Sequence, residues 1–119
     1  MSYDLAFWQG PMPADDDEAA EEFERRAAFM EDDDVDFAPP TPEMQAFITE
    51  LLRQFPPLDE SADEDTNVWA TGPEPGDING DFAYLTMTYP GAERAYDLVT
   101  ETARKHGLVC FDPQDESLA

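Results

Sequence analysis

Two residues that could support covalent catalysis occur once each in this chain of 119 residues, His106 and Cys110. A cysteine and a histidine can form a nucleophile and its base when they lie within hydrogen-bond reach. Here His106 closes a helical pattern and Cys110 lies within an apolar run, so we interpret them as a helix cap and a core side chain. A single histidine and a single cysteine also provide no zinc-ligand set. The sequence therefore predicts a protein that is not an enzyme.

One segment has the spacing of oxygen ligands for a metal. Asp77, Asn79 and Asp81 alternate as in a calcium-binding loop. However, Gly80 comes too early for such a loop, and Thr88 stands where the bidentate glutamate should be. Asn79-Gly80 is instead a strong signal for a tight hairpin turn. We therefore expect a hairpin here, and no metal or other cofactor in the protein.

Carboxylates are by far the most abundant chemical groups, with 29 acidic against six basic side chains and a net charge of −23. Between Asp15 and Asp36, 12 acidic residues accompany two arginines, and the acidic run 59–65 contains no base. Residues 82–111, by contrast, hold three acids and three bases. A localised patch of like charge repels itself and opposes folding. An electropositive partner is the commonest reason for such a patch.

The elements that must position these groups follow from hydrophobic periodicity. Helix 41–55 is the clearest, because Thr41 is a good N-cap, Pro42 suits the first helical position and a wide apolar stripe follows. Residues 68–70 fit either a short strand or a loop anchored by Trp69. The other expected elements are strand 3–8, helix 15–31, strand 82–89, helix 92–106 and strand 108–111.

The order β-α-α-β-β-α-β predicts a single α+β domain over residues 1–119. We expect a small, mostly antiparallel sheet of about four strands with the helices packed on one face. The strands on either side of helix 92–106 can form one crossover unit. A hydrophobic content of 41% is enough for a core. Acidic loops are expected around 31–40 and 58–66.

The chain shows no signal peptide at its N-terminus and no apolar run long enough to span a bilayer. We therefore expect a soluble, cytoplasmic protein, present as a monomer or weak dimer. A surface this negative would be repelled by phosphates and by anionic lipids. Direct binding to nucleic acid or to a membrane is not expected.

Three stretches carry a resemblance to a known family: YDLAFW at 3–8, the helix with its Pro-Pro end at 42–57, and a tail from Ala92 that contains KHGLVCFDP at 105–113. Together they resemble a family of small, largely uncharacterised bacterial proteins associated with toxin–immunity and contact-dependent competition loci. The resemblance implies an α+β fold and a role in neutralising a toxin. The matching residues are strand, cap and turn positions, so no functional residues carry over.

We predict that the protein binds and neutralises a cognate basic toxin, with a nuclease as the favoured target because nuclease surfaces are basic. Aromatic side chains commonly anchor such interfaces, and Trp8, Trp69, Phe29 and Phe37 are candidates. Taken singly, each of the four is more often a core residue than an anchor. Phe29 stands out because it lies off the apolar stripe of its helix. The predicted partner-binding residues are Phe29, Asp32, Asp33, Asp34, Asp36, Phe37, Asp63, Glu64 and Asp65.

Two alternatives remain open at the level of sequence. A nucleic-acid mimic would bind many DNA-handling proteins, although blocks of adjacent aspartates match phosphate spacing poorly. A salt-adapted housekeeping domain would carry its acids for solubility and would have no basic partner. Competition by duplex DNA distinguishes the mimic from the inhibitor, and dependence of the fold on molar salt would favour the adapted domain.

Overall fold

The computed structural model describes residues 3–28, 38–56, 67–70 and 76–119. The strands in these ranges are β1 (Tyr3–Gln9), β2 (Gly76–Asn79), β3 (Phe82–Met87), β4 (Leu108–Asp112) and β5 (Ser117–Leu118). The helices are α1 (Asp16–Ala27), α2 (Pro42–Gln54) and α3 (Tyr89–Lys105). The predicted α+β class and element order are confirmed. The sheet has five strands rather than about four, because the short strand β5 was not expected.

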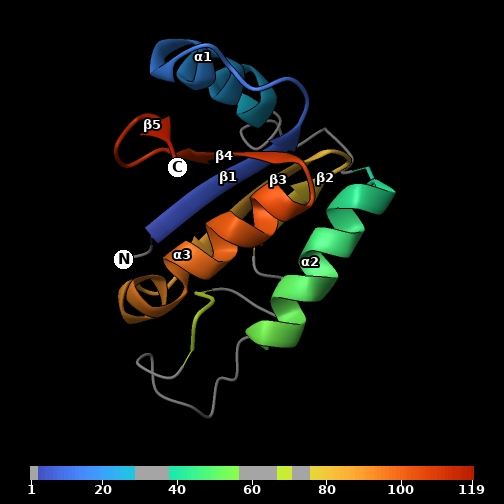
Figure 1. Cartoon of the computed structure of the whole chain (residues 1–119), viewed down its shortest axis with the longest axis vertical. Coiled ribbons are helices and arrows are strands. Elements are labelled where there is room, and N and C mark those ends of the chain that lie inside the picture. Colours follow the sequence, from blue (N-terminus) through green and yellow to red (C-terminus); the bar gives the residue numbers. More distant parts are fainter. Residues whose placement is uncertain (1–2, 29–37, 57–66, 71–75) are drawn as a thin grey trace.

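The five strands form one antiparallel sheet in the order β2-β3-β1-β4-β5. The first strand of the chain therefore lies in the middle, between β3 and β4 (Figure 1). Because both neighbours run antiparallel to β1, β3 and β4 run parallel to each other, and α3 connects them. The crossover unit predicted from the sequence thus exists, with β1 inserted between its two strands.

Both faces of the sheet are covered, which corrects the expectation of helices on one face only. Along β1, Leu5 and Phe7 join one buried cluster, whereas Ala6 and Trp8 join another on the opposite face. Helices α2 and α3 pack on the first face and α1 on the second (Figure 1). The physical reason is that β1 and β4 are apolar on both sides, and a sheet with two apolar faces needs a cover on each.

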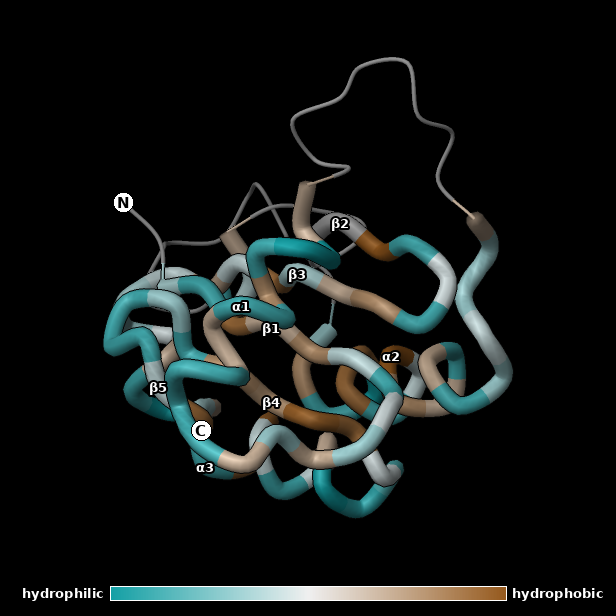
Figure 2. The backbone as a smooth tube through the Cα atoms, turned by 90° about the horizontal axis from the view of Figure 1, so that it is seen from above, coloured by the Kyte–Doolittle hydropathy of each residue, from teal (hydrophilic) through white to brown (hydrophobic). Residues whose placement is uncertain are grey.

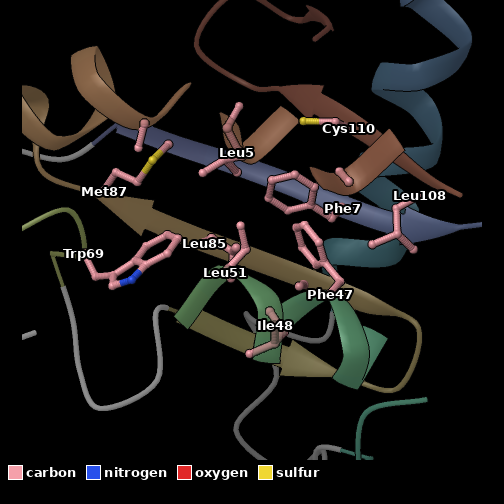
Figure 3. Close-up of a cluster of buried hydrophobic side chains, with 14 of the residues drawn as sticks. Leu5, Phe7, Phe47, Ile48, Leu51, Trp69, Leu85, Met87, Leu108 and Cys110 are labelled. Atoms are coloured by element: carbon pink, nitrogen blue, oxygen red, sulfur yellow. The ribbon is translucent and has the colours of Figure 1, made fainter. Parts of the chain in front are cut away.

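The larger cluster lies between the sheet and helices α2 and α3 (Figure 3). Phe7 from β1 contacts Phe47 from α2, with ring centroids 4.9 Å apart. Trp69, fully buried, donates a hydrogen bond of 2.8 Å from its indole N–H to the carbonyl of Phe55 at the end of α2. Residues 68–70 therefore form an anchored loop that makes a single bridge, Trp69 to Met87, rather than a strand. The predicted apolar stripe of α2 is confirmed.

The smaller cluster lies under α1, which is a highly charged helix with a narrow apolar stripe. Phe23 is its main contact, with its ring centroid 5.2 Å from that of Phe111 and 6.1 Å from that of Tyr84. Strand β4, which contributes Val109 and Phe111 to this cluster, has the brown colour of hydrophobic residues in Figure 2. Asp15 caps the helix by accepting a hydrogen bond from the Glu18 amide at 2.8 Å. The stripe predicted for this helix is thus confirmed over its described residues.

Helix α3 begins at Tyr89, three residues before the predicted start at Ala92. Thr88 is the N-cap, and its hydroxyl oxygen accepts a hydrogen bond of 2.9 Å from the Gly91 amide. Pro90 therefore lies in the first turn of the helix, where proline is well tolerated, instead of ending the preceding strand. This earlier start places Tyr89 on the same helix as Tyr96.

Candidate functional site

All nine residues predicted to bind a partner lie outside the described residues. They are Phe29, Asp32, Asp33, Asp34, Asp36, Phe37, Asp63, Glu64 and Asp65. Their assignment stays a prediction from the sequence.

The two tryptophans considered as interface anchors are core residues. Trp8 is 1% exposed and Trp69 is fully buried. Trp8 packs under α1 and Trp69 under α2, so neither can anchor a partner without unfolding the region around it. The structure thus confirms the core interpretation, which the sequence favours for each residue taken singly, and rules out both tryptophans as anchors.

The residues with catalytic chemistry have structural positions, as the sequence predicted. Cys110 is 4% exposed within the larger cluster, and burial raises the pKa of its thiol well above the ordinary value, which disfavours the nucleophilic thiolate. His106 is the C-cap of α3, and its Nε2 lies 3.7 Å from Glu50 Oε1. Lys105 Nζ reaches the same oxygen at 2.8 Å, so the end of α3 is fastened to α2.

The segment with alternating oxygen ligands is a hairpin, as predicted. Gly80 has a φ of 60° in the turn between β2 and β3. Asn79 Oδ1 accepts a hydrogen bond from the Ala38 amide at 2.6 Å, and Asp81 Oδ1 lies 3.3 Å from Arg26 Nη1. These side-chain oxygens therefore join the hairpin to the segment before α2 and to α1. Among the described residues, no three His, Cys, Asp or Glu side chains are grouped to hold a metal ion.

A pocket of about 450 Å³ lies where the start of β1, the first two turns of α3 and the turn between β4 and β5 meet. Its volume is within the range of small-ligand pockets. Its lining residues are Tyr3, Tyr89, Ala92, Glu93, Tyr96, Asp97 and Asp115. Three of the seven are tyrosines and three are carboxylates, so the pocket is both aromatic and acidic.

The ring of Tyr3 stands nearly perpendicular to the rings of Tyr89 and Tyr96. The ring of Tyr3 is 6.4 Å from that of Tyr89 at an interplanar angle of 77°, and 5.9 Å from that of Tyr96 at 86°. Edge-to-face pairs of this kind are a favourable arrangement for aromatic quadrupoles. Tyr3 is therefore held by contacts with both tyrosines of α3.

A buried carboxylate fixes Tyr3 from the other side. The Tyr3 hydroxyl donates a hydrogen bond to Asp112 Oδ2, and Asp112 is 1% exposed. Its Oδ1 accepts hydrogen bonds from Gln114 Nε2 at 2.6 Å and from the Gln114 amide at 3.1 Å. Gln114 also joins Asp4, whose amide donates to Gln114 Oε1 at 2.7 Å. This network ties the turn after β4 to the start of β1.

Burial and the carboxylate of Asp112 raise the pKa values of two tyrosine side chains in the pocket. Burial, with a contribution from the carboxylate of Asp112, raises the pKa of Tyr96 to about 12. Burial also raises the pKa of Tyr3, reinforced by its hydrogen bond to Asp112. Both side chains are therefore neutral phenols at physiological pH.

The rim of the pocket is negative. Glu93, Asp97 and Asp115 are exposed. In the part of the chain that the structure describes, none of the three forms an ion pair with a lysine or arginine. Their carboxylates are therefore available to pair with a cationic group that enters the pocket.

A second pocket, of about 240 Å³, lies beneath α1 and differs in character. Arg25 and Arg26 line it, and both pair with Glu22. Arg26 also donates to the carbonyl of Gln9 at 3.2 Å. Arg26 therefore fastens α1 to the end of β1, while Arg25 pairs within its own helix. We take the larger, tyrosine-lined pocket as the candidate functional site.

Comparisons with protein-family models, with curated proteins and with solved structures found no match. The resemblance to the family from toxin–immunity loci therefore stays a prediction from the sequence. None of the described helices is both long and apolar enough to cross a membrane.

Proposed function

We propose that this protein acts by binding: it neutralises a cognate basic toxin, specifically a nuclease, in the cytoplasm by occluding the toxin's active or substrate-binding surface. The observation that carries the proposal is the localised negative charge within a net charge of −23. The acidic rim of the tyrosine-lined pocket adds support, because Glu93, Asp97 and Asp115 are exposed and form no ion pair with a lysine or arginine among the described residues.

The charge has a kinetic advantage for this role. A nuclease carries a basic surface because it binds phosphates. Complementary charge raises association rates by about 10- to 1,000-fold and suppresses wrong partners. Fast capture matters for an inhibitor, since a free nuclease damages nucleic acid from the moment it is released.

The proposal is tested by reversing charge at the residues predicted from the sequence. The toxin is first captured from a lysate with the unchanged protein. We expect the triple substitution Asp32→Lys, Asp33→Lys and Asp34→Lys to weaken the complex with this toxin sharply without unfolding the domain. Close charge pairs across an interface can contribute about 1.5–7 kcal/mol of coupling, whereas charges at the rim act mainly on the association rate.

A matched variant controls for net charge. Glu24, Glu43 and Glu101 are exposed and spread over three helices, so changing them to lysine alters the net charge equally. Equal loss of affinity in both triple variants would mean unspecific attraction. Unchanged affinity in the Asp32–Asp34 variant would mean that this acidic cluster is not part of the interface.

A further inference from the structure

We propose that the pocket formed by Tyr3, Tyr89 and Tyr96 receives an arginine side chain of the basic partner. The inference rests on the proposed function and specifies the chemical group that the protein recognises. It rests on three features of the pocket: the aromatic walls, the carboxylates at the rim and the network that holds Tyr3 in place.

The aromatic walls fit a cation. Tyr3 stands at 77° to Tyr89 and at 86° to Tyr96, so the pocket of about 450 Å³ is bounded by rings in different planes. The faces of aromatic rings carry negative electrostatic potential and attract cations, and cages of several rings recognise cationic groups in this way. Tyr89 is 43% exposed, so an incoming side chain can reach its ring.

The carboxylates exclude anions and supply hydrogen-bond acceptors. Glu93 and Asp97 lie four residues apart on α3, on the same side of the helix as Tyr89 and Tyr96. Asp115 faces them from the turn between β4 and β5. A neutral apolar ligand would desolvate these carboxylates without compensation, whereas a cation pairs with them.

The Tyr3 wall is fixed before any ligand arrives. The hydroxyl of Tyr3 is bound to Asp112, which Gln114 holds in turn at 2.6 Å. Since Tyr3 also belongs to the central strand β1, its ring cannot turn away without breaking this network. A preformed pocket loses little conformational freedom on binding, which improves affinity.

Arginine matches this set of groups better than lysine. The guanidinium is planar, stacks on aromatic faces and donates to carboxylates in pairs, whereas the ammonium of lysine is a strongly hydrated point charge. Arginine is also the more frequent cation over aromatic rings in proteins.

The first test is a titration of the full-length protein with N-acetyl-arginine amide, followed by NMR of the tyrosine ring protons at constant ionic strength. We expect saturable shifts for Tyr3, Tyr89 and Tyr96, and weaker binding of N-acetyl-lysine amide. N-acetyl-citrulline amide, which has nearly the same shape without the charge, should not bind. No saturable shift, or equal binding of the citrulline compound, would overturn the inference.

Variants with matched controls locate the binding. Tyr89→Ala should weaken arginine binding by roughly 2- to 5-fold, the usual effect of one aromatic ring on a cation. Glu93→Gln with Asp97→Asn should weaken it further. The controls are Leu98→Ala and Glu101→Gln, which change exposed side chains of the same helix outside the pocket. Controls that weaken binding as much as the pocket variants would also overturn the inference.

The same variants separate this inference from the proposed function. If a captured toxin binds Tyr89→Ala as tightly as Leu98→Ala, the pocket does not receive the toxin's arginine, although neutralisation stands. If N-acetyl-arginine amide binds the pocket but no basic toxin exists, the recognition of arginine stands and the proposed function fails.

Discussion

At the scale of single residues, Gly91 shows how closely two segments approach. A Cβ atom on Gly91 would lie 2.6 Å from the Cα of Val68 and 2.8 Å from its carbonyl oxygen, both parts of the backbone. The loop that carries Trp69 can therefore pass over α3 only because residue 91 has no side chain. From the sequence, Gly91 lies between the predicted strand 82–89 and the predicted helix 92–106, and nothing in the sequence reveals which distant segment packs against it.

We predict that Gly91→Ala destabilises the protein by about 1–3 kcal/mol, because the added methyl group overpacks a site bounded by backbone. Helix propensity alone predicts the opposite, a gain of up to about 1 kcal/mol. Chemical denaturation decides the sign, with the exposed Glu101→Ala on the same helix as a control. A stabilised Gly91→Ala variant would contradict the close approach of Val68.

The pocket phenols give a prediction about alkaline pH. The pKa of Tyr96 is raised to about 12 in the folded protein, above the ordinary value of about 10. A raised folded-state pKa contributes stability that is complete below about pH 10 and is lost as the pH rises through about 12. We therefore expect stability to fall over this interval, and Tyr96→Phe to reduce that fall. Absorbance of tyrosinate follows the ionisation, and circular dichroism recorded on the same samples follows the unfolding. If Tyr96→Phe lost stability over the same pH range to the same extent as the unchanged protein, Tyr96 would not be the group responsible.

At the scale of elements, the helices and most strands could be predicted because their periodicity and caps are local signals. Thr41 and Pro42 begin α2 as predicted, and its stripe is buried. The layering could not be predicted in the same way. Val109 and Phe111 alternate with Leu108 and Cys110 along β4, so both faces are apolar, yet the charged sequence of α1 hides its role as a cover.

Phe23 is the one aromatic side chain of α1 and its main apolar contact with the sheet. We predict that Phe23→Ala costs about 2–3 kcal/mol, below the range for a fully buried phenylalanine because Phe23 is partly exposed. In the Phe23→Ala variant, the rate of amide hydrogen exchange should increase more in α1 than in α2. Glu24→Ala, on the exposed side of the same helix, is the control. A loss of under about 0.5 kcal/mol would mean that α1 is not held by this contact.

The candidate site was missed because the sequence places one helix boundary too late. The predicted strand 82–89 includes Tyr89, so the sequence analysis does not place Tyr89 on one helix face with Glu93, Tyr96 and Asp97. The signal lies in residues 89, 93, 96 and 97, which have helical spacing once Thr88 is recognised as the N-cap. The contact with Tyr3 is of long range and could come only from the fold.

At the scale of the whole molecule, the net charge of −23 opposes folding. Raising NaCl from about 0.01 M to about 0.15 M shortens the Debye length from about 30 Å to about 8 Å, which screens this repulsion. We predict a rise in Tm over that range and little change above it. For a domain of this size, about 1 kcal/mol corresponds to roughly 4 °C.

Thermal unfolding in NaCl, with KCl as a comparison, tests this prediction. A fold that requires molar salt would favour the salt-adapted domain instead. A Tm independent of salt would mean that the acidic groups hardly repel one another in the folded protein.

The central claim, that the protein neutralises a basic toxin, is tested most directly by capture from the source organism's lysate and neighbouring gene products. At about 0.15 M salt, attraction between exposed charges is screened beyond about 8 Å. We predict one dominant basic protein that duplex DNA does not displace and whose activity falls to zero at stoichiometric amounts of inhibitor. A spread of DNA-binding proteins displaced by DNA, or no captured protein at all, would contradict the claim.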